Sequence, residues 1–391
     1  MRIAFITGSI AQGRDGVGDY ARRLSGELAR NRCASTVIAW NEPFATETCI
    51  STEDSGSGPV DLLALPAALP AAVRLERART WLSEFAPDWL SLQYSPFAFH
   101  PRGLPFGLAP ALAKLAQDRL VHIMFHETWV SETLLSRPKH WLLGRAQREL
   151  VRRMASILSP DWVNTSNARY ALDLRRLGLN ANVLPLFGNI PICPRSGWLL
   201  GELPQLGVAD GNRDGWLLLG IFGAVHPEWA VNGWWDYLVR ETRRIGRRIA
   251  LLGIGRVAGR GLEHFHRATA PCRRDGVVHH FGEQPADRIS DFLQSIDGGI
   301  SNTPLELIGK SGSAAAMADH GVPVLATRER NGREPYSLYM AIDAWLALRR
   351  EPNKPRPGAS SLDAAARNLS HQLLVAPKAR GLVAPPRSSP A

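Results

Sequence analysis

The run Gly309-Lys310-Ser311-Gly312 combines residue types that could bind a phosphate, at the start of a helix predicted over Ser311–His320. A lysine beside a helix N-terminus brings together a cation, unpaired N–H groups and the positive end of the helix dipole, an arrangement that suits a diphosphate. The alternative is structural, with Ser311 or Ser313 capping the helix and Lys310 facing solvent. A P-loop is not indicated, because that motif needs a glycine where this chain has Pro304.

Glycines at the ends of two predicted strands are further candidates for donor-phosphate binding. Gly16 and Gly18 lie in the loop and helix start that follow the strand Arg2–Thr7, and Gly223 follows the strand Trp216–Phe222. Glycine lets the backbone approach a ligand closely. The spacing departs from the dinucleotide-binding pattern G-x-G-x-x-G, so an ordinary strand-to-helix turn explains the first loop equally well.

His126 and Glu127 follow the predicted strand Val121–Phe125, at the end where an open parallel sheet presents functional side chains. His126 is a candidate catalytic residue or a structural histidine with satisfied hydrogen bonds. Glu127 is a candidate substrate contact or a carboxylate at a helix N-terminus. His226, in the loop after Gly223, is a further candidate substrate contact.

The elements that must position these residues alternate between apolar strand-like runs and amphipathic helical runs, which is typical of parallel sheets covered by helices. The predicted strands are Arg2–Thr7, Ser35–Ala39, Trp89–Gln93, Val121–Phe125, Asn182–Leu186, Trp216–Phe222, Ile249–Leu252, Val277–Phe281, Gly298–Ser301 and Val322–Thr327. The predicted helices are Gly18–Arg30, Val73–Phe85, Leu104–Gln117, Ala168–Leu177, Val231–Arg244, Pro285–Ser295 and Ser311–His320. The polar stretch Thr46–Pro59 reads as a surface loop.

This order of elements predicts an α/β chain of two Rossmann-like, doubly wound domains that face each other across a cleft. We expect one domain over residues 1–195, a second over 196–353 and a C-terminal extension over 354–391 whose last dozen residues are disordered. Ligands would bind at the carboxyl ends of both sheets.

Composition limits the class of protein. The 391 residues are 45% hydrophobic and 21% charged, a globular balance, and the formal net charge of +10 suits an anionic partner or merely a solvated basic surface. The four cysteines lie far apart without a C-x-x-C pair, which indicates a reducing compartment and neither a disulfide framework nor a zinc site. No apolar stretch reaches the length of a membrane span. We therefore expect a soluble, cytoplasmic protein.

A basic amphipathic helix is predicted over Arg137–Met154, with Arg145, Arg148 and Arg152 on one face. It would either lie on the inner, anionic face of a membrane and meet a lipid-linked acceptor, or bury its apolar face as an ordinary domain helix.

Several motifs in this order resemble those of glycosyltransferase family 4, a retaining family with the GT-B fold. The similar segments cover roughly residues 1–330: Gly13–Arg30, Ala86–Tyr94, Met124–Glu127, Leu177–Pro191, Arg247–Gly255 and Ile289–Thr327. The resemblance implies transfer of a sugar from a nucleotide-sugar to an acceptor, either a polysaccharide or a lipid-linked molecule, with retention. It implies that residues 1–195 form the acceptor-side domain and residues 196–353 the nucleotide-sugar-binding domain. It implies no metal and no other cofactor, and we find no D-x-D pair.

The same resemblance assigns roles residue by residue. His126 would contact the donor sugar or orient the leaving group, and Glu306 matches the first of two glutamates, the one that reaches the sugar. The second glutamate is replaced by Ala314, and the usual Arg and Lys of the diphosphate site are missing between Phe222 and Tyr237. Lys310 would then supply the missing cation. Otherwise the donor differs or donor binding is lost.

Two other function classes compete with glycosyl transfer. A catalytically inactive GT-B-like binding or scaffold protein would explain the missing glutamate and the missing cations. Nucleic-acid binding rests on the basic charge alone and lacks a recognisable module, so we expect none.

Overall fold

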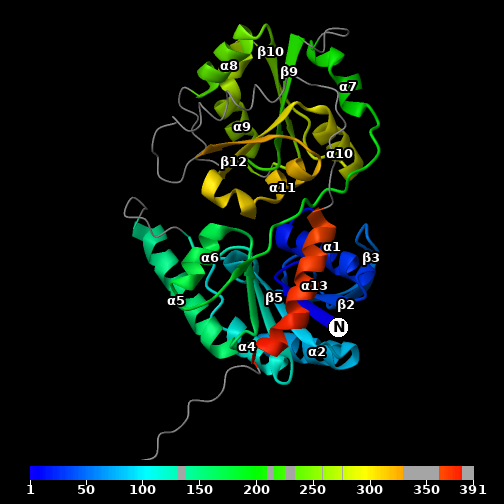
Figure 1. Cartoon of the computed structure of the whole chain (residues 1–391), viewed down its shortest axis with the longest axis vertical. Helices are drawn as coiled ribbons and strands as arrows, with labels where there is room; N and C mark the ends of the chain where they lie inside the picture. The colour runs from blue at the N-terminus through cyan, green and yellow to red at the C-terminus, as the bar shows by residue number, and fades with distance from the viewer. Residues whose placement is uncertain are drawn as a thin grey trace, which may run out of the picture. The chain divides into compact units, whose positions relative to one another are not determined.

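The computed structural model describes residues 1–130, 138–208, 215–225, 234–257, 259–274, 276–328 and 361–380. The chain divides into two units, one formed by Met1–Leu186 with Leu362–Ala391 and the other by Phe187–Ser361. Each unit contains its own sheet with helices around it (Figure 1). Among the described residues, we find no helix with both the length and the apolar character needed to cross a bilayer.

The sheet of the first unit has the strand order β3-β4-β2-β1-β5-β6-β7-β8. All neighbours pair in parallel except β3, which runs antiparallel to β4. Its central strand β1 is buried at every position after Arg2, because both faces of a parallel sheet are covered. The strands are β1 (Arg2–Thr7), β2 (Ala34–Glu42), β3 (Cys49–Asp54), β4 (Pro59–Pro66), β5 (Trp89–Tyr94), β6 (Leu120–Phe125), β7 (Trp162–Thr165) and β8 (Asn182–Val183).

Helices of the first unit connect these strands and bury one stripe each. Its helices are α1 (Gly16–Arg30), α2 (Ala71–Phe85), α3 (Pro96–Phe99), α4 (Leu108–Ala116), α5 (Pro138–Leu158), α6 (Ala168–Arg175) and α13 (Ser361–Arg380). α13 comes from the far end of the sequence yet packs in this unit, where Figure 1 shows it in red. Its side chain Gln372 accepts a hydrogen bond from Nδ2 of Asn164 on β7 at 3.0 Å.

The second unit has a five-stranded parallel sheet in the order β11-β10-β9-β12-β13. Alternate residues of β9 enter two different cores: Leu217 and Leu219 pack on one face, and Trp216 and Leu218 on the other. Burial on both faces explains why this strand is a continuous apolar run. The strands are β9 (Trp216–Phe222), β10 (Arg248–Ile254), β11 (Val277–His280), β12 (Gly298–Pro304) and β13 (Val324–Arg328).

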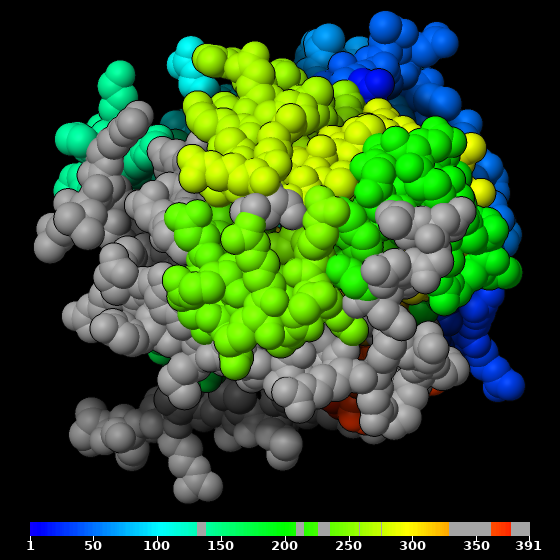
Figure 2. Space-filling view, turned by 90° about the horizontal axis from the view of Figure 1, so that it is seen from above, coloured from blue at the N-terminus to red at the C-terminus, as the bar shows by residue number. Residues whose placement is uncertain are grey.

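The helices of the second unit start with α7, in the segment that follows the first unit in the sequence. The carboxylate of Asp291 accepts from the N–H groups of Ser196, Gly197 and Leu199, and so fixes the start of α7. In Figure 2 the elements from α7 to α9 form much of the coloured surface of this unit, in shades of green. The helices are α7 (Trp198–Glu202), η1 (Pro204–Leu206), α8 (Trp234–Arg244), α9 (Gly261–Thr269), η3 (Ala270–Arg274), α10 (Ala286–Ser295), η4 (Leu305–Lys310) and α11 (Gly312–Asp319).

The predicted α/β class with two doubly wound parallel sheets is confirmed. The prediction of a loop over Thr46–Pro59 is wrong, because Cys49–Asp54 forms the edge strand β3, whose side chains are mostly exposed and, apart from Cys49 and Ile50, polar. The C-terminal stretch contains the helix Ser361–Arg380, which the sequence analysis missed. Residues 381–391, for which disorder is predicted, lie outside the described residues.

Candidate functional site

The first sheet reverses its winding direction between β1 and β5, because β2 lies on one side of β1 and β5 on the other. In open α/β sheets ligands bind outside the carboxyl ends of the strands at such a point. The loop after β1 and the residues after β6 both lie at this end. They carry four of the predicted site residues: Gly16, Gly18, His126 and Glu127.

Carboxylates of the chain itself bind the N–H groups of the loop after β1. Asp15 accepts from the N–H groups of Val17 and Gly18 as the N-cap of α1, and Asp19 accepts from Gly13. The carboxylate of Glu42 accepts from the hydroxyl of Ser9 and the N–H of Ile10. Burial raises the pKa of both Asp15 and Asp19.

Gly16 and Gly18 differ in their surroundings. A Cβ atom on Gly18 would lie 2.2 Å from the carbonyl oxygen of Ser9, whereas one on Gly16 would meet nothing within 4 Å. Gly18 therefore lets α1 pack against the loop, and its N–H group is already bound to Asp15. Contact of either glycine with a donor or acceptor stays a prediction.

His126 lies at the end of β6 and is only 6% exposed. Its Nε2 is 2.9 Å from Oε1 of Gln93, and its ring meets that of Tyr20 edge to face at 4.7 Å. Burial, with a smaller contribution from His122, lowers the pKa of His126 to about 3. The imidazole is therefore neutral at physiological pH.

A chain of hydrogen bonds continues from Gln93 through the interior of the first unit. Nε2 of Gln93 donates to the Ser91 hydroxyl at 2.8 Å, and this hydroxyl is 2.7 Å from Nδ1 of His122. Nε2 of His122 is 3.0 Å from Oδ1 of Asn164, whose amide in turn donates to Gln372 of α13. Four of these side chains are completely buried: Ser91, Gln93, His122 and Asn164.

The donor and the acceptor of every hydrogen bond in this series follow from Asn164, the residue at its end. Oδ1 of Asn164 only accepts, so His122 carries its proton on Nε2 and accepts the Ser91 proton on Nδ1. Ser91 then accepts from Gln93, whose remaining Oε1 accepts from His126. His126 is thereby held as the Nε2–H tautomer, with Nδ1 as a hydrogen-bond acceptor. We call these five side chains from His126 to Asn164 the histidine relay.

Glu127 does not start a helix, since residues 127–130 are non-helical. One of its carboxylate oxygens accepts from the hydroxyl of Ser95 at 3.1 Å, at the N-terminal end of the short helix α3. The carboxylate thus lies beside a helix N-terminus, though one that begins elsewhere in the chain. A contact of Glu127 with substrate stays a prediction.

The second sheet reverses its winding direction between β9 and β12, and the predicted residues of this unit that the structure describes follow these two strands in the chain. Gly223 follows β9 with φ +86°, and a Cβ atom on it would lie 2.9 Å from the hydroxyl oxygen of Ser313 in α11. Nδ2 of Asn302 on β12 donates to the carbonyl of Ala224 at 3.0 Å. These contacts hold the loop after β9 against the first turn of α11.

The Gly-Lys-Ser run forms the end of η4 and the start of α11. Ser311 is the N-cap of α11 and accepts from the N–H of Ala314, as the structural alternative predicts. Lys310 is the last residue of η4 and is half-buried, and Gly309 and Gly312 lie on either side of the Lys310–Ser311 pair. Glu306 is exposed in η4. Ala314 is 5% exposed, so the position of the absent glutamate is filled by a buried methyl group.

The predicted substrate contact His226 is not among the described residues, and neither are residues 227–233. Within the described ranges, no group of three or more His, Cys, Asp or Glu side chains is arranged to hold a metal ion. The histidine relay was not predicted from the sequence. The sequence signal of the relay is a set of polar residues inside otherwise apolar strands.

The comparisons with known proteins give the fold. No family model matches the chain, and no curated protein matches it. The catalytic domain of starch synthase IV from Arabidopsis thaliana, bound to ADP and acarbose, aligns with a TM-score of 0.58 and 11% identity over 96% of this chain and 99% of that one.

Two bacterial structures are similar over comparable lengths. A putative UDP-N-acetylglucosamine 2-epimerase from Listeria monocytogenes has a TM-score of 0.55 and 12% identity, covering 97% of each chain. A glycosyltransferase from Rickettsia africae has a TM-score of 0.53 and 10% identity, also covering 97% of each. At these identities the likeness concerns the fold alone: two Rossmann-like units of the GT-B type.

Proposed function

We propose that this chain is a retaining, metal-independent glycosyltransferase of the family 4 type, which transfers a sugar from a nucleotide-sugar donor to a polysaccharide or lipid-linked acceptor. The similar folds support the general class, since they include a glycosyltransferase and starch synthase IV, and three of the similar structures are complexes with UDP-GlcNAc, ADP or UDP. The ordered motifs of the sequence support the family.

The observation that carries the proposal is the arrangement at the winding reversal of the second sheet. There a glycine in the left-handed region, Gly223, lets the loop after β9 lie close to the first turn of α11. The first N–H groups of a helix have no partner within it, and the helix dipole favours an anion. Lys310 adds a cation one residue before the N-cap Ser311. This is the chemistry that a departing nucleoside diphosphate requires.

In the first unit, the proposed role of His126 is that of a neutral acceptor. With Nε2–H committed to Gln93, Nδ1 of His126 is the atom that would accept a hydrogen bond from a sugar hydroxyl group. Because its pKa is lowered to about 3, His126 would not act as a cation toward the leaving group. Glu306 is the proposed carboxylate near the anomeric carbon.

The test is turnover of a panel of nucleotide-sugars, followed by proton NMR of the anomeric region, which separates transfer, hydrolysis and epimerisation. We expect Lys310→Ala and Glu306→Ala each to lower kcat/KM by about 10- to 100-fold, the effect of losing a hydrogen bond to a charged group. Lys114→Ala and Glu84→Ala, at exposed positions in the first unit, are the charge-matched controls. Activity that is equal in all four variants would refute the site.

A second candidate function is a GT-B-like binding protein without catalysis. The buried Ala314 favours it, because the chain offers no carboxylate at that position. The two functions separate cleanly in one comparison: both predict that UDP or ADP binds and that Lys310→Ala weakens binding, and only the first predicts a sugar-transfer or hydrolysis product.

A further inference from the structure

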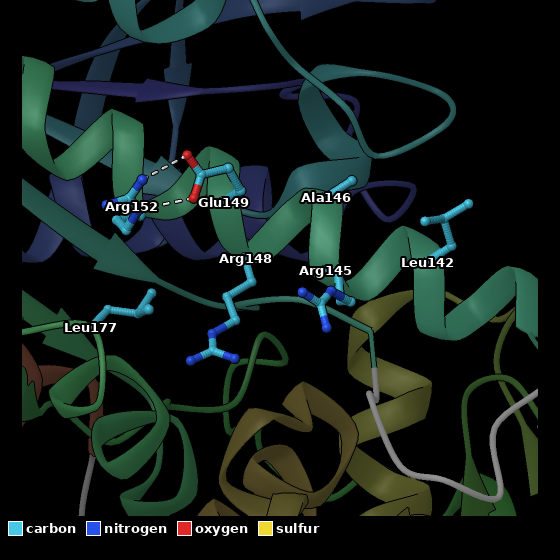
Figure 3. Close-up of a pocket in the computed structure, with 7 residues that line it drawn as sticks. All are labelled: Leu142, Arg145, Ala146, Arg148, Glu149, Arg152 and Leu177. Atoms are coloured by element: carbon cyan, nitrogen blue, oxygen red, sulfur yellow. Dashed lines mark hydrogen bonds and ion pairs between the residues drawn. The ribbon is translucent and has the colours of Figure 1, made fainter.

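The surface of α5 contains a hollow of about 510 Å³ that none of the roles above uses. Arginines line its centre and leucines its ends, as the close-up in Figure 3 shows. In that view the side chains of Arg145 and Arg148 extend to one side of the helix, and the carboxylate of Glu149 lies on the other. The lining residues are Leu142, Arg145, Ala146, Arg148, Glu149, Arg152 and Leu177.

The charge of the hollow is positive. Among the described residues that line it, the one carboxylate is that of Glu149, which is paired with Arg152 at 2.8 Å and with Arg153 at 2.9 Å. These two arginines lower the pKa of Glu149 to about 2, so it remains ionised and bound to them. The guanidinium of Arg145 lies over the ring of Trp141 at 4.8 Å, which orients it beside the hollow.

The arginine face is not needed to hold α5 in the fold. The helix packs into the first unit through a different stripe, formed by Gly144, Gln147, Val151, Met154 and Leu158. Gln147 also fixes the helix through bonds from the N–H of Val130 and to the carbonyl of Gly103. Arg145 and Arg148 are therefore exposed at a helix whose packing is already complete.

The apolar residues beside the arginines indicate the kind of molecule that would bind in the hollow. Leu142 is 65% exposed and Trp141 38% exposed on the same helix. An arginine presents several N–H donors in a planar fork that matches phosphate oxygens. Arginines beside exposed apolar side chains suit a phosphate group joined to an apolar chain better than they suit a fully hydrated ion.

We propose that Arg145 and Arg148, with Arg152 at the edge, form a binding site for a phosphate group, supplied either by a lipid headgroup or by a soluble phosphate compound. This inference goes beyond the proposed function, because binding here requires no sugar transfer. Two variants of the whole chain test it. Arg145→Ala/Arg148→Ala removes two cations from the hollow, and Arg77→Ala/Arg79→Ala removes two exposed cations from α2 as the charge-matched control.

The experiment has two arms. In the first, sedimentation measures partition of each protein onto vesicles of phosphatidylcholine with or without phosphatidylglycerol, at low and at high salt. In the second, calorimetry measures binding of inorganic pyrophosphate. If the source is a lipid headgroup, we expect binding to the anionic vesicles, weakened about 30-fold by the α5 variant, little changed by the α2 variant, and reduced by salt.

The remaining outcomes also decide the matter. Pyrophosphate binding that is lost only in the α5 variant, without vesicle binding, supports the site with a soluble compound as its ligand. Equal loss in both double variants shows a general charge effect and overturns the site. Absence of binding in both arms overturns it too. Circular dichroism confirms that the alanine variants keep their helices, as alanine favours helix at exposed positions.

Discussion

Nε2 of His126 lies 2.9 Å from Oε1 of Gln93, and this contact is the first bond of a relay that reaches Asn164 through buried side chains of β5, β6 and β7. Both histidines in the relay are inside the first unit, and burial is the main reason that their pKa values are low, about 3 for His126 and about 4 for His122. Burial keeps both rings neutral, and the hydrogen bonds of the relay hold each ring in one tautomer.

The buried histidines predict a pH-dependent stability. Between pH 6.5 and about 4, His122 binds a proton in the unfolded chain and not in the folded one. Its contribution is therefore complete above pH 6.5 and is lost as the pH falls toward 4, by about 1.4 kcal/mol per pH unit. His122→Gln should remove that part of the slope of unfolding free energy against pH, measured by urea denaturation.

The exposed His140 on α5 provides the control for this measurement. His140→Gln should leave the slope between pH 5 and pH 6.5 as it is in the unsubstituted chain. Identical slopes in the His122 variant and the unsubstituted chain would show that His122 is accessible to protons in the folded protein.

Replacement by alanine should lower the free energy of unfolding at Gly18 but not at Gly16. Gly18→Ala places a methyl group 2.2 Å from the backbone oxygen of Ser9, so either the loop or α1 must shift. We expect a loss of about 1–3 kcal/mol in the free energy of unfolding. Gly16→Ala meets no atom within 4 Å and should be neutral or stabilising by less than about 1 kcal/mol. Equal effects in thermal unfolding would contradict the packing role of Gly18.

Gly223 should affect both nucleotide binding and stability. Gly223→Ala strains a backbone at φ +86° and brings a methyl group against the hydroxyl of Ser313, so either that side chain or the loop after β9 must shift. We expect the Kd for UDP or ADP to rise about 10-fold or more, as for a lost charge-assisted hydrogen bond. Gly246→Ala has similar strain, φ +75°, with no atom within 4 Å, and serves as the control.

The Gly246 control makes the expected result specific. Both variants should lose stability, because alanine is unfavourable in the left-handed region. Only Gly223→Ala should lose affinity in calorimetric titrations. A matching loss of affinity in both variants would assign the effect to stability and leave the loop after β9 without a role in binding.

Leu369 tests whether α13 is an integral part of the first unit. Its side chain is completely buried, whereas that of Leu374 on the same helix is 59% exposed. Leu369→Ala should lower the free energy of unfolding by about 2–5 kcal/mol, and Leu374→Ala by no more than about 0.5 kcal/mol. Urea denaturation monitored by tryptophan fluorescence measures both, and similar values for the two variants would mean that α13 contributes little packing energy.

Two strands that are buried on both faces, β1 and β9, could be predicted from the sequence to the residue, whereas the largely buried β4 and β7 were not predicted. β1 and β9 are apolar along their lengths, so Arg2–Thr7 and Trp216–Phe222 have the predicted bounds. The edge strand β3 could not, because β4 is its one neighbour in the described sheet and most of its exposed side chains are polar like those of a loop. α13 has a weak sequence signal for the same reason: its burial depends on a partner far away in the chain.

Part of the candidate site could be predicted from the sequence and part could not. The glycines, Ser311 and His126 follow predicted strands or start a predicted helix, so their places at the sheet ends could be anticipated from topology. The protonation state of His126 could not, since it depends on Gln93, His122 and Asn164, which come together only when three strands pair. Spacing along the sequence contains no information about which polar side chains share one buried face.

The packing of α13 has a consequence for biosynthesis. A ribosome releases β1 to β8 first and α13 only after the whole of the second unit, although α13 belongs with those strands. While residues 187–360 are being synthesised, the surface against which Leu362, Leu369 and Leu373 will pack stays uncovered on the nascent first unit. Translation order thus makes the second unit able to fold before the first is complete, and it exposes an apolar surface of the first unit to chaperones for that interval.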